Sequence, residues 1–223
     1  MQSIVVQLFV FLHAVRIATS LSAPATTTAS PWQSFVESLF PSNNAAANND
    51  KAITARRNEL KQSLTVECRQ NVGYNSPEIR QRIETIMDQL ATLNPTPETA
   101  ASPLLKREWI LEWTSEKEIN FFLEKGISEE IIQTLNGDIL ENYIPFVKGG
   151  GFGVTGQIGV DEEREGGMRT NFKFKNANLN LGRWGEYNFP PVGEGWFDTI
   201  YLDEGLRIDT NSRNDVLICR ADN

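Results

Sequence analysis

The sequence has few of the residues on which many catalytic and metal-binding sites depend. Among its 223 residues there are one histidine, His13, and two cysteines. Because His13 lies in an apolar N-terminal run that we expect to be cleaved, the mature protein would lack histidine. This absence excludes Ser–His–Asp and Cys–His nucleophile activation, and zinc or haem ligated by histidine. We therefore expect no metal and no cofactor.

The two cysteines, Cys68 and Cys219, lie too far apart in the sequence for a CxxC metal or redox pair. A disulfide between them requires that the fold bring them together. The simpler expectation is two buried, reduced thiols that act as small apolar side chains.

Positive charge and long apolar runs are also scarce. The formal net charge is −8, which argues against the clustered Lys and Arg that grip nucleic-acid phosphates. The apolar stretch at residues 4–15 is shorter than the roughly 20 residues of a membrane span, so we expect no transmembrane segment in the mature protein. The remaining composition, with 40% hydrophobic residues, is that of a globular protein.

The N-terminal region predicts targeting. Residues 1–20 have the apolar core of a signal peptide, with small residues Ala18 and Ser20 before the cut. Residues 21–52 are expected to be a transit-peptide-like segment, without any acid before Glu37, followed by a polar linker at 41–50.

This arrangement resembles the bipartite presequence of algae whose plastids are wrapped in extra membranes. The segment TSLSAPA resembles the Ala-Phe-Ala-Pro type motif of such presequences, with Leu21 where Phe is usual. Plain secretion is the alternative, but the chain has neither a usable N-x-S/T sequon nor a cysteine framework. We therefore expect plastid import.

Residues 53–223 are predicted to form one domain, with helices at 53–95 and a barrel at 105–223. The first helix is expected from about Asp50 to Gln70, and the second begins with an N-cap at Ser76 and a first-turn proline. From Trp109 on, apolar residues alternate and glycines are frequent, which predicts short strands; only 118–135 is expected to hold a helix or turn. The fold class is thus mainly β (α+β overall), an antiparallel barrel packed against helices.

Two patterns that suggest chemistry have better structural explanations. Residues 151–156 match G-x-G-x-x-G, but a strand-like sequence follows where a dinucleotide site needs a helix, so we expect glycines of a barrel rim.

Asp198 and Asp203 are an odd number of residues apart and would point to opposite faces of a strand unless a bulge intervenes. We expect Asp203 to pair with Arg207 or cap a turn, and we expect no enzyme.

Apolar side chains supply the candidate binding surface. Alternation places Trp109, Leu111 and Trp113 on one face of a strand, and Phe172 and Phe174 on one face of another. Such residues either fill the core or line a barrel interior that holds an apolar or ring-bearing guest. The candidate lining residues are Trp109, Leu111, Trp113, Phe172, Phe174 and Trp196.

The C-terminal segment GWFDTIYLDEGLRIDTNSRNDVLICRA (195–221) resembles the closing signature of the plastid-lipid-associated proteins, also called plastid fibrillins. Three further segments resemble family elements in the same order: WILEWTSEKEINFF (109–122), NFKFKNANL (171–179) and FPPVGEG (189–195). The similarity covers roughly residues 60–221. The motif's polar positions fall on Asp198, Thr199, Tyr201, Asp203 and Arg207, which we expect to define the fold. Gly205 occupies the position at which the family often has an acidic residue, directly after Asp203 and Glu204.

The resemblance implies a lipocalin-like barrel preceded by two amphipathic helices, in a protein of plastoglobules or thylakoids. It also implies non-catalytic binding of lipids or lipophilic pigments and quinones. Attachment to a lipid surface would use exposed aromatics at the barrel mouth or the apolar face of the helix at 76–94. Because the chain is acidic, this attachment should be hydrophobic and nearly independent of salt. The alternative is a packed barrel that acts as a protein-interaction scaffold for plastid isoprenoid or quinone metabolism.

Overall fold

A computed structural model describes residues 43–190 and 193–222, so the expected signal peptide and most of the transit-like segment lie outside the described residues. The chain divides into two units, residues 1–59 and Leu60–Asn223, and the barrel belongs to the second. The helices are α3 (Asn43–Gln70), α4 (Pro77–Thr92) and α5 (Lys117–Glu124), with short 3₁₀ turns η1 (Thr99–Ala101), η2 (Pro103–Leu105) and η3 (Gly182–Trp184).

Helix α4 begins as the sequence predicts. The Ser76 hydroxyl accepts a hydrogen bond from the Ile79 amide, and Pro77 occupies the first turn, where a missing N–H costs nothing. Its buried face consists of Ile83, Met87 and Leu90. Helix α3 differs from the prediction, because it begins at Asn43 and so includes residues 43–50, which were expected to form a linker.

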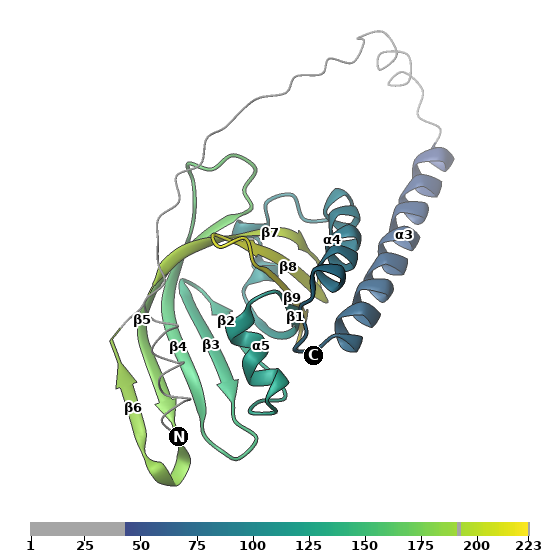
Figure 1. Cartoon of the computed structure of the whole chain (residues 1–223). Coiled ribbons are helices and arrows are strands. Elements are labelled where there is room, and N and C mark those ends of the chain that lie inside the picture. The colour runs from purple at the N-terminus through teal and green to yellow at the C-terminus, as the bar shows by residue number, and fades with distance from the viewer. Residues whose placement is uncertain (1–42, 191–192, 223) are drawn as a thin grey trace. The chain divides into compact units, whose positions relative to one another are not determined.

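The described residues contain nine strands in one antiparallel sheet: β1 (Glu108–Thr114), β2 (Ile132–Asn136), β3 (Ile139–Pro145), β4 (Gly151–Val160), β5 (Arg169–Asn180), β6 (Glu186–Phe189), β7 (Glu194–Leu202), β8 (Leu206–Asn211) and β9 (Val216–Ala221). Their order is β4-β3-β2-β1-β9-β8-β7-β5, and pairing of β4 with β5 closes these eight into a barrel (Figure 1). Strand β6 pairs with residues 177–180 of β5, whereas β7 pairs with residues 169–173 of the same strand. The barrel confirms the predicted fold class.

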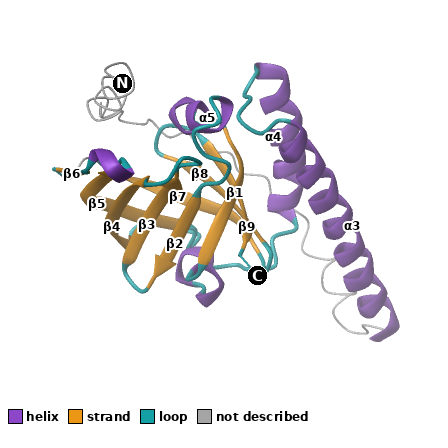
Figure 2. Ribbon diagram, turned by 90° about the horizontal axis from the view of Figure 1, so that it is seen from below, coloured by secondary structure: helices purple, strands orange, loops and turns teal. Residues whose placement is uncertain are grey.

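The apolar core has two parts, separated by the barrel wall. Helix α4 lies outside the barrel (Figure 2), so the cluster that contains its buried face marks the outer side of the sheet. That cluster also contains Leu64, Cys68, Tyr201 and Ile208. The second cluster, which includes Trp109, Leu135, Leu140, Leu202 and Cys219, occupies the barrel interior.

A β-bulge moves Trp113 away from the face on which the sequence places it. The register between β1 and β9 shifts between Leu111 and Trp113, so alternation is interrupted there. Trp109 and Leu111 belong to the interior cluster, whereas Trp113 belongs to the outer cluster. Its indole N–H donates to the Tyr74 carbonyl at 3.0 Å. The prediction that Trp113 shares a face with Trp109 and Leu111 is therefore wrong.

The two ends of the barrel differ. At one end, which we call the closed end, η1 and η2 cross the strands: the Thr99 hydroxyl donates to the Thr199 carbonyl at 2.6 Å, and Leu105 is fully buried. At the other, the hairpin end, lie α5, the β8–β9 turn and the β3–β4 and β5–β6 hairpins (Figure 1). Helix α5 packs at the hairpin end, where Phe122 is buried and stacks against Phe146 with ring centroids 6.3 Å apart.

Candidate ligand-binding interior of the barrel

The inner wall of the barrel is apolar, and some of its side chains are only partly buried. Phe172 and Phe174 lie in contact on β5, with ring centroids 5.0 Å apart, and Phe172 also stacks against Phe197 at 6.5 Å. Phe172, Phe174, Leu111 and Leu217 are only partly buried, although they pack against the interior cluster. Trp109, Leu135, Leu140 and Leu202, by contrast, are almost entirely buried. Side chains thus fill the closed end, and four apolar side chains of the inner wall retain some exposed surface.

A buried ion pair lies on the inner wall at β8, which is separated from β5 by β7. Arg207 and Asp209 on β8 point into the barrel, and Nε of Arg207 lies 3.0 Å from Oδ2 of Asp209. The Thr199 hydroxyl donates to the other Asp209 oxygen at 2.7 Å, and the guanidinium lies 5.1 Å from the Trp109 ring centroid. Burial raises the pKa of Asp209, although the Arg207 charge opposes this shift.

The guanidinium is linked to two amides that are only partly buried. Nη2 of Arg207 donates to Oε1 of Gln133, and Nε2 of Gln133 donates to Oδ1 of Asn142 at 2.7 Å. Nη1 of Arg207 is buried, and no group of the described residues accepts its hydrogen bonds. The inner wall thus combines aromatic surface with a short line of polar groups, which is the usual composition of a site for a lipophilic molecule with a polar end.

The family-motif carboxylates outside this interior are each held by other groups. Asp198 receives two hydrogen bonds of 2.8 Å from Arg169, whose guanidinium lies 3.5 Å from the Trp196 ring centroid. A bulge between Thr199 and Tyr201 in fact intervenes before Asp203.

Asp203 caps a turn, as expected, by accepting hydrogen bonds from the Gly205 and Leu206 amides. Its ion pair is with Lys61, and the Tyr201 hydroxyl donates to it at 2.7 Å. Burial by itself raises the pKa of Asp203, but the hydrogen bonds from Lys61 and Tyr201 outweigh it and lower that pKa. The expected partner, Arg207, instead pairs with Asp209.

The structure brings together four of the six predicted lining residues. Trp109, Leu111, Phe172 and Phe174 belong to the interior cluster, whereas Trp113 and Trp196 do not. Phe172 and Trp196 border an open depression of about 490 Å³ that crosses β4, β5 and β7 at residues 157–159, 171–173 and 194–196. The sequence reasoning missed Gln133 and Asn142; the alternation of Gln133 with Leu135 and of Asn142 with Leu140 and Ile144 could have placed both inside.

Both cysteines are free and buried. Burial raises the pKa of the Cys219 thiol to about 11 and raises that of Cys68 further, so neither is a reactive thiolate near neutral pH.

Within the described residues, no three or more Cys, Asp or Glu side chains are placed to hold a metal ion. None of the described helices is both long enough and apolar enough to cross a membrane.

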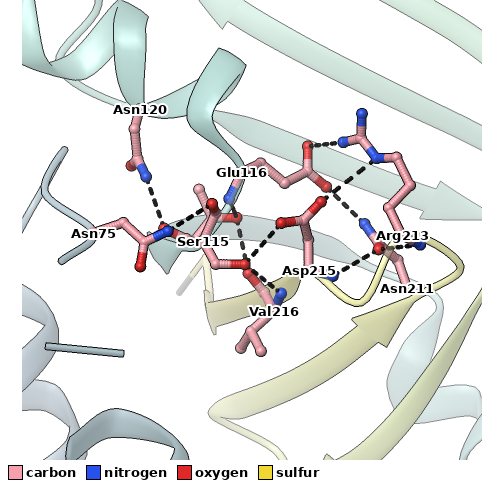
Figure 3. A network of polar contacts seen from close by, with 9 residues as sticks. Asn75, Ser115, Glu116, Asn120, Asn211, Arg213, Asp215 and Val216 are labelled. Carbon is pink, nitrogen blue, oxygen red and sulfur yellow. Dashed lines mark hydrogen bonds and ion pairs between the residues drawn. The ribbon is translucent and has the colours of Figure 1, made fainter. Parts of the chain in front are cut away.

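A second polar network lies at the hairpin end, where α5 meets the β8–β9 turn (Figure 3). Glu116 accepts a hydrogen bond from Asn211 at 2.8 Å and pairs with Arg213 at 3.1 Å, while only 12% of its side chain is exposed. The Ser115 hydroxyl bridges Asp215 and the Val216 amide, each at 2.9 Å. Burial raises the pKa of Glu116 to about 7. This network ties the end of β1 to the start of β9.

Comparisons with known proteins agree with the motifs in the sequence. The profile of the PAP_fibrillin family matches residues 58–184. The chain is 30% identical over 169 residues to "Probable plastid-lipid-associated protein 11, chloroplastic" from Arabidopsis thaliana, and the match covers 73% of this chain and 77% of that protein. No solved structure matches at a comparable level. The chain therefore belongs to the PAP_fibrillin family, the plastid-lipid-associated proteins.

Proposed function

We propose that the protein is a non-catalytic plastid protein that binds lipids or lipophilic pigments and quinones and rests on plastoglobule or thylakoid surfaces. The observation that carries the proposal is the inner wall of the barrel, where Phe172, Phe174, Leu111 and Leu217 stay partly exposed. Leaving such apolar surface in contact with water is unfavourable, and an apolar guest would remove the cost. The family and the chloroplastic relative support the plastid location.

The polar groups of the interior suggest how a guest would lie. Its apolar part would cover the Phe172 and Phe174 rings, and a carbonyl or hydroxyl oxygen would meet the partly buried amides of Gln133 and Asn142. Arg207, hydrogen-bonded to Gln133, would fix the orientation of that amide. A ligand with one polar end and a ring or chain, such as a quinone or pigment, fits this arrangement.

The positions of the carboxylates support a non-catalytic role. Asp198 is paired with Arg169, Asp203 with Lys61 and Asp209 with Arg207. A general base must be free to take a proton from a substrate, and these three already accept hydrogen bonds or face a fixed cation. The packed-scaffold alternative keeps the same fold but requires that no guest enter the interior.

Lipid association is tested by flotation with phosphatidylcholine vesicles. Both core clusters consist of residues from Leu60 on, so a chain that starts at residue 43 retains the whole described core and omits the apolar N-terminal run. We expect this protein to float with the vesicles and the bound fraction to change less than about twofold when salt rises from about 0.05 to 0.5 M. Absence from the vesicle fraction, or release at moderate salt, would contradict the proposal.

A further inference from the structure

Large exposed apolar side chains gather on two neighbouring hairpins at the hairpin end. On the β5–β6 hairpin Trp184 is 57% exposed and Tyr187 49% exposed, and on the β3–β4 hairpin Val147 is 56% and Tyr143 38% exposed. We call Tyr143, Val147, Trp184 and Tyr187 the hairpin-tip surface. A tryptophan in water at the tip of a turn adds little to the fold, so its exposure calls for another explanation.

The two tips lie side by side. Gly151, at the start of β4, pairs with Asn180, at the end of β5, so both hairpins turn from neighbouring strands at the same level. A side chain on Gly150 would collide with the Asn180 carbonyl, which shows that the two backbones touch. Figure 1 shows both hairpins projecting from the same end of the barrel. The two tips can therefore meet one common partner, although the strand register places Tyr143 and Tyr187 on opposite faces of the sheet.

The β5–β6 tip has a well-defined conformation. Gly182 and Gly185 have positive φ angles, +60° and +105°, which frame the η3 turn, and the Gly182 amide donates to the Asn180 side chain at 2.7 Å. The Tyr187 hydroxyl donates to the Trp184 carbonyl at 3.0 Å. Because the backbone that carries Trp184 is already ordered, binding through it costs little conformational entropy.

Charge distinguishes the two ends of the barrel. The hairpin-tip surface is flanked by Lys148 and Arg183, with the carboxylate of Glu186 beside Tyr187, and the Arg183 guanidinium lies 4.7 Å from the Trp184 ring centroid. At the closed end, the β4–β5 loop carries the acidic run DEERE at 161–165, next to Val160. A surface with phosphate or other anionic head groups would therefore accept the hairpin end and repel the closed end.

The other apolar face that could meet lipid is already covered. The apolar face of α4, which the sequence offered as a membrane contact, is buried: Ile83, Met87 and Leu90 belong to the outer core cluster. The exposed Ile139 and Val160 lie at the closed end, close to Asp138 and the acidic run. Among the large exposed apolar residues of the described barrel strands and hairpins, those of the hairpin-tip surface combine aromatic rings with neighbouring cations; Val66, Val72 and Tyr74 are exposed elsewhere, on α3 and the turn after it.

We propose that the hairpin-tip surface is the face by which the barrel rests on a lipid layer, with Trp184 and Tyr187 inserted among the head groups and Lys148 and Arg183 beside the phosphates. The inference deepens the proposed function and rests on it. Aromatic rings with one polar atom prefer the lipid–water boundary.

The test compares matched double variants of the chain from residue 43. Trp184→Ser with Tyr187→Ser removes both rings from the hairpin-tip surface, and Ile139→Ser with Val160→Ser removes two apolar side chains of comparable fractional exposure from the closed end. In flotation with phosphatidylcholine vesicles, we expect the partition coefficient of the first variant to fall about tenfold for each ring, because each ring loses roughly 50 Å² of inserted apolar area at about 25 cal/mol per Å². The second should stay within about twofold of the parent chain.

Trp184→Phe provides a readout that does not depend on loss of binding. Brominated lipids quench only indoles that lie in the lipid layer; Trp109 and Trp113 are buried in the protein, and Trp196 is only partly exposed, with the Arg169 guanidinium over its ring. We expect the parent chain to be quenched and Trp184→Phe to lose most of this quenching while it still floats. Unchanged quenching, or equal flotation of both double variants, would overturn the hairpin-tip surface but leave lipid binding intact. A parent chain that does not float would overturn the proposed function as well.

Discussion

Replacing Asp209 by alanine is expected to lower the free energy of unfolding by about 3–5 kcal/mol, the largest effect among the substitutions considered. The Arg207 guanidinium is fully buried, and Asp209 is its ion-pair partner at 3.0 Å. Without that carboxylate a positive charge would remain in the apolar interior, and the Thr199 hydroxyl would lose its acceptor. Urea denaturation followed by circular dichroism measures the loss.

A double variant separates the cost of an unpaired charge from the value of the pair. Arg207→Met with Asp209→Leu removes both charges and fills a similar volume, and such exchanges are often neutral or stabilising. We expect it to be more stable than Asp209→Ala. If Asp209→Ala costs less than about 1 kcal/mol, the interior around Arg207 is wet and our description of a packed closed end is wrong.

Raising the pH through the titration of Glu116 is expected to destabilise the protein by up to about 3 kcal/mol. Burial raises the folded-state pKa of Glu116 from 4.5 to about 7, so the folded state binds the proton more tightly than the unfolded state does. The stability from this group is therefore fully present below pH 4.5, declines as pH rises, and is lost above pH 7. The cause is desolvation, only partly offset by Arg213.

Glu116→Gln serves as the control, because its amide oxygen can still accept the Asn211 hydrogen bond while it carries no charge at any pH. The difference in unfolding free energy between the two proteins should be small at about pH 5. At about pH 8, Glu116→Gln should be the more stable by up to about 3 kcal/mol. Parallel pH profiles for the two proteins would show that Glu116 ionises in the folded state as it does in water.

Features that depend on local sequence could be predicted well. The N-cap and first-turn proline at Ser76 and Pro77 act within one turn of helix, so the start of α4 follows from the residues themselves. The alternation of Phe172 and Phe174 with charged neighbours likewise places both rings on the inner wall. Such signals need no knowledge of distant parts of the chain.

Features that depend on long-range pairing could not be predicted in the same way. The bulges at Leu111/Trp113 and Thr199/Tyr201 change which face a side chain occupies, and they arise from the register with β9 and β8. Strand β2 falls within a region expected to hold a helix or turn, because α5 occupies only its first part. Lys61 became the partner of Asp203 through the packing of α3, which is distant in sequence.

The candidate site shows the same division. The sequence predicted the aromatic residues of the site, but its polar residues meet only because the barrel closes. Gln133, Asn142 and Arg207 come from β2, β3 and β8, and only the order of the strands brings their side chains together. Hydrophobic periodicity does not predict that an arginine is buried. The residues next to Arg207 in the sequence predict only that it lies in a strand.

The most direct test of the central claim, that the barrel holds a lipophilic guest, is native mass spectrometry of residues 43–223 after incubation with a plastid lipid and pigment extract. Our account predicts a discrete one-to-one adduct whose mass identifies a molecule with an apolar ring or chain and one polar end. A clean mass of the protein alone, with the fold intact by circular dichroism, would contradict the claim and favour the packed scaffold.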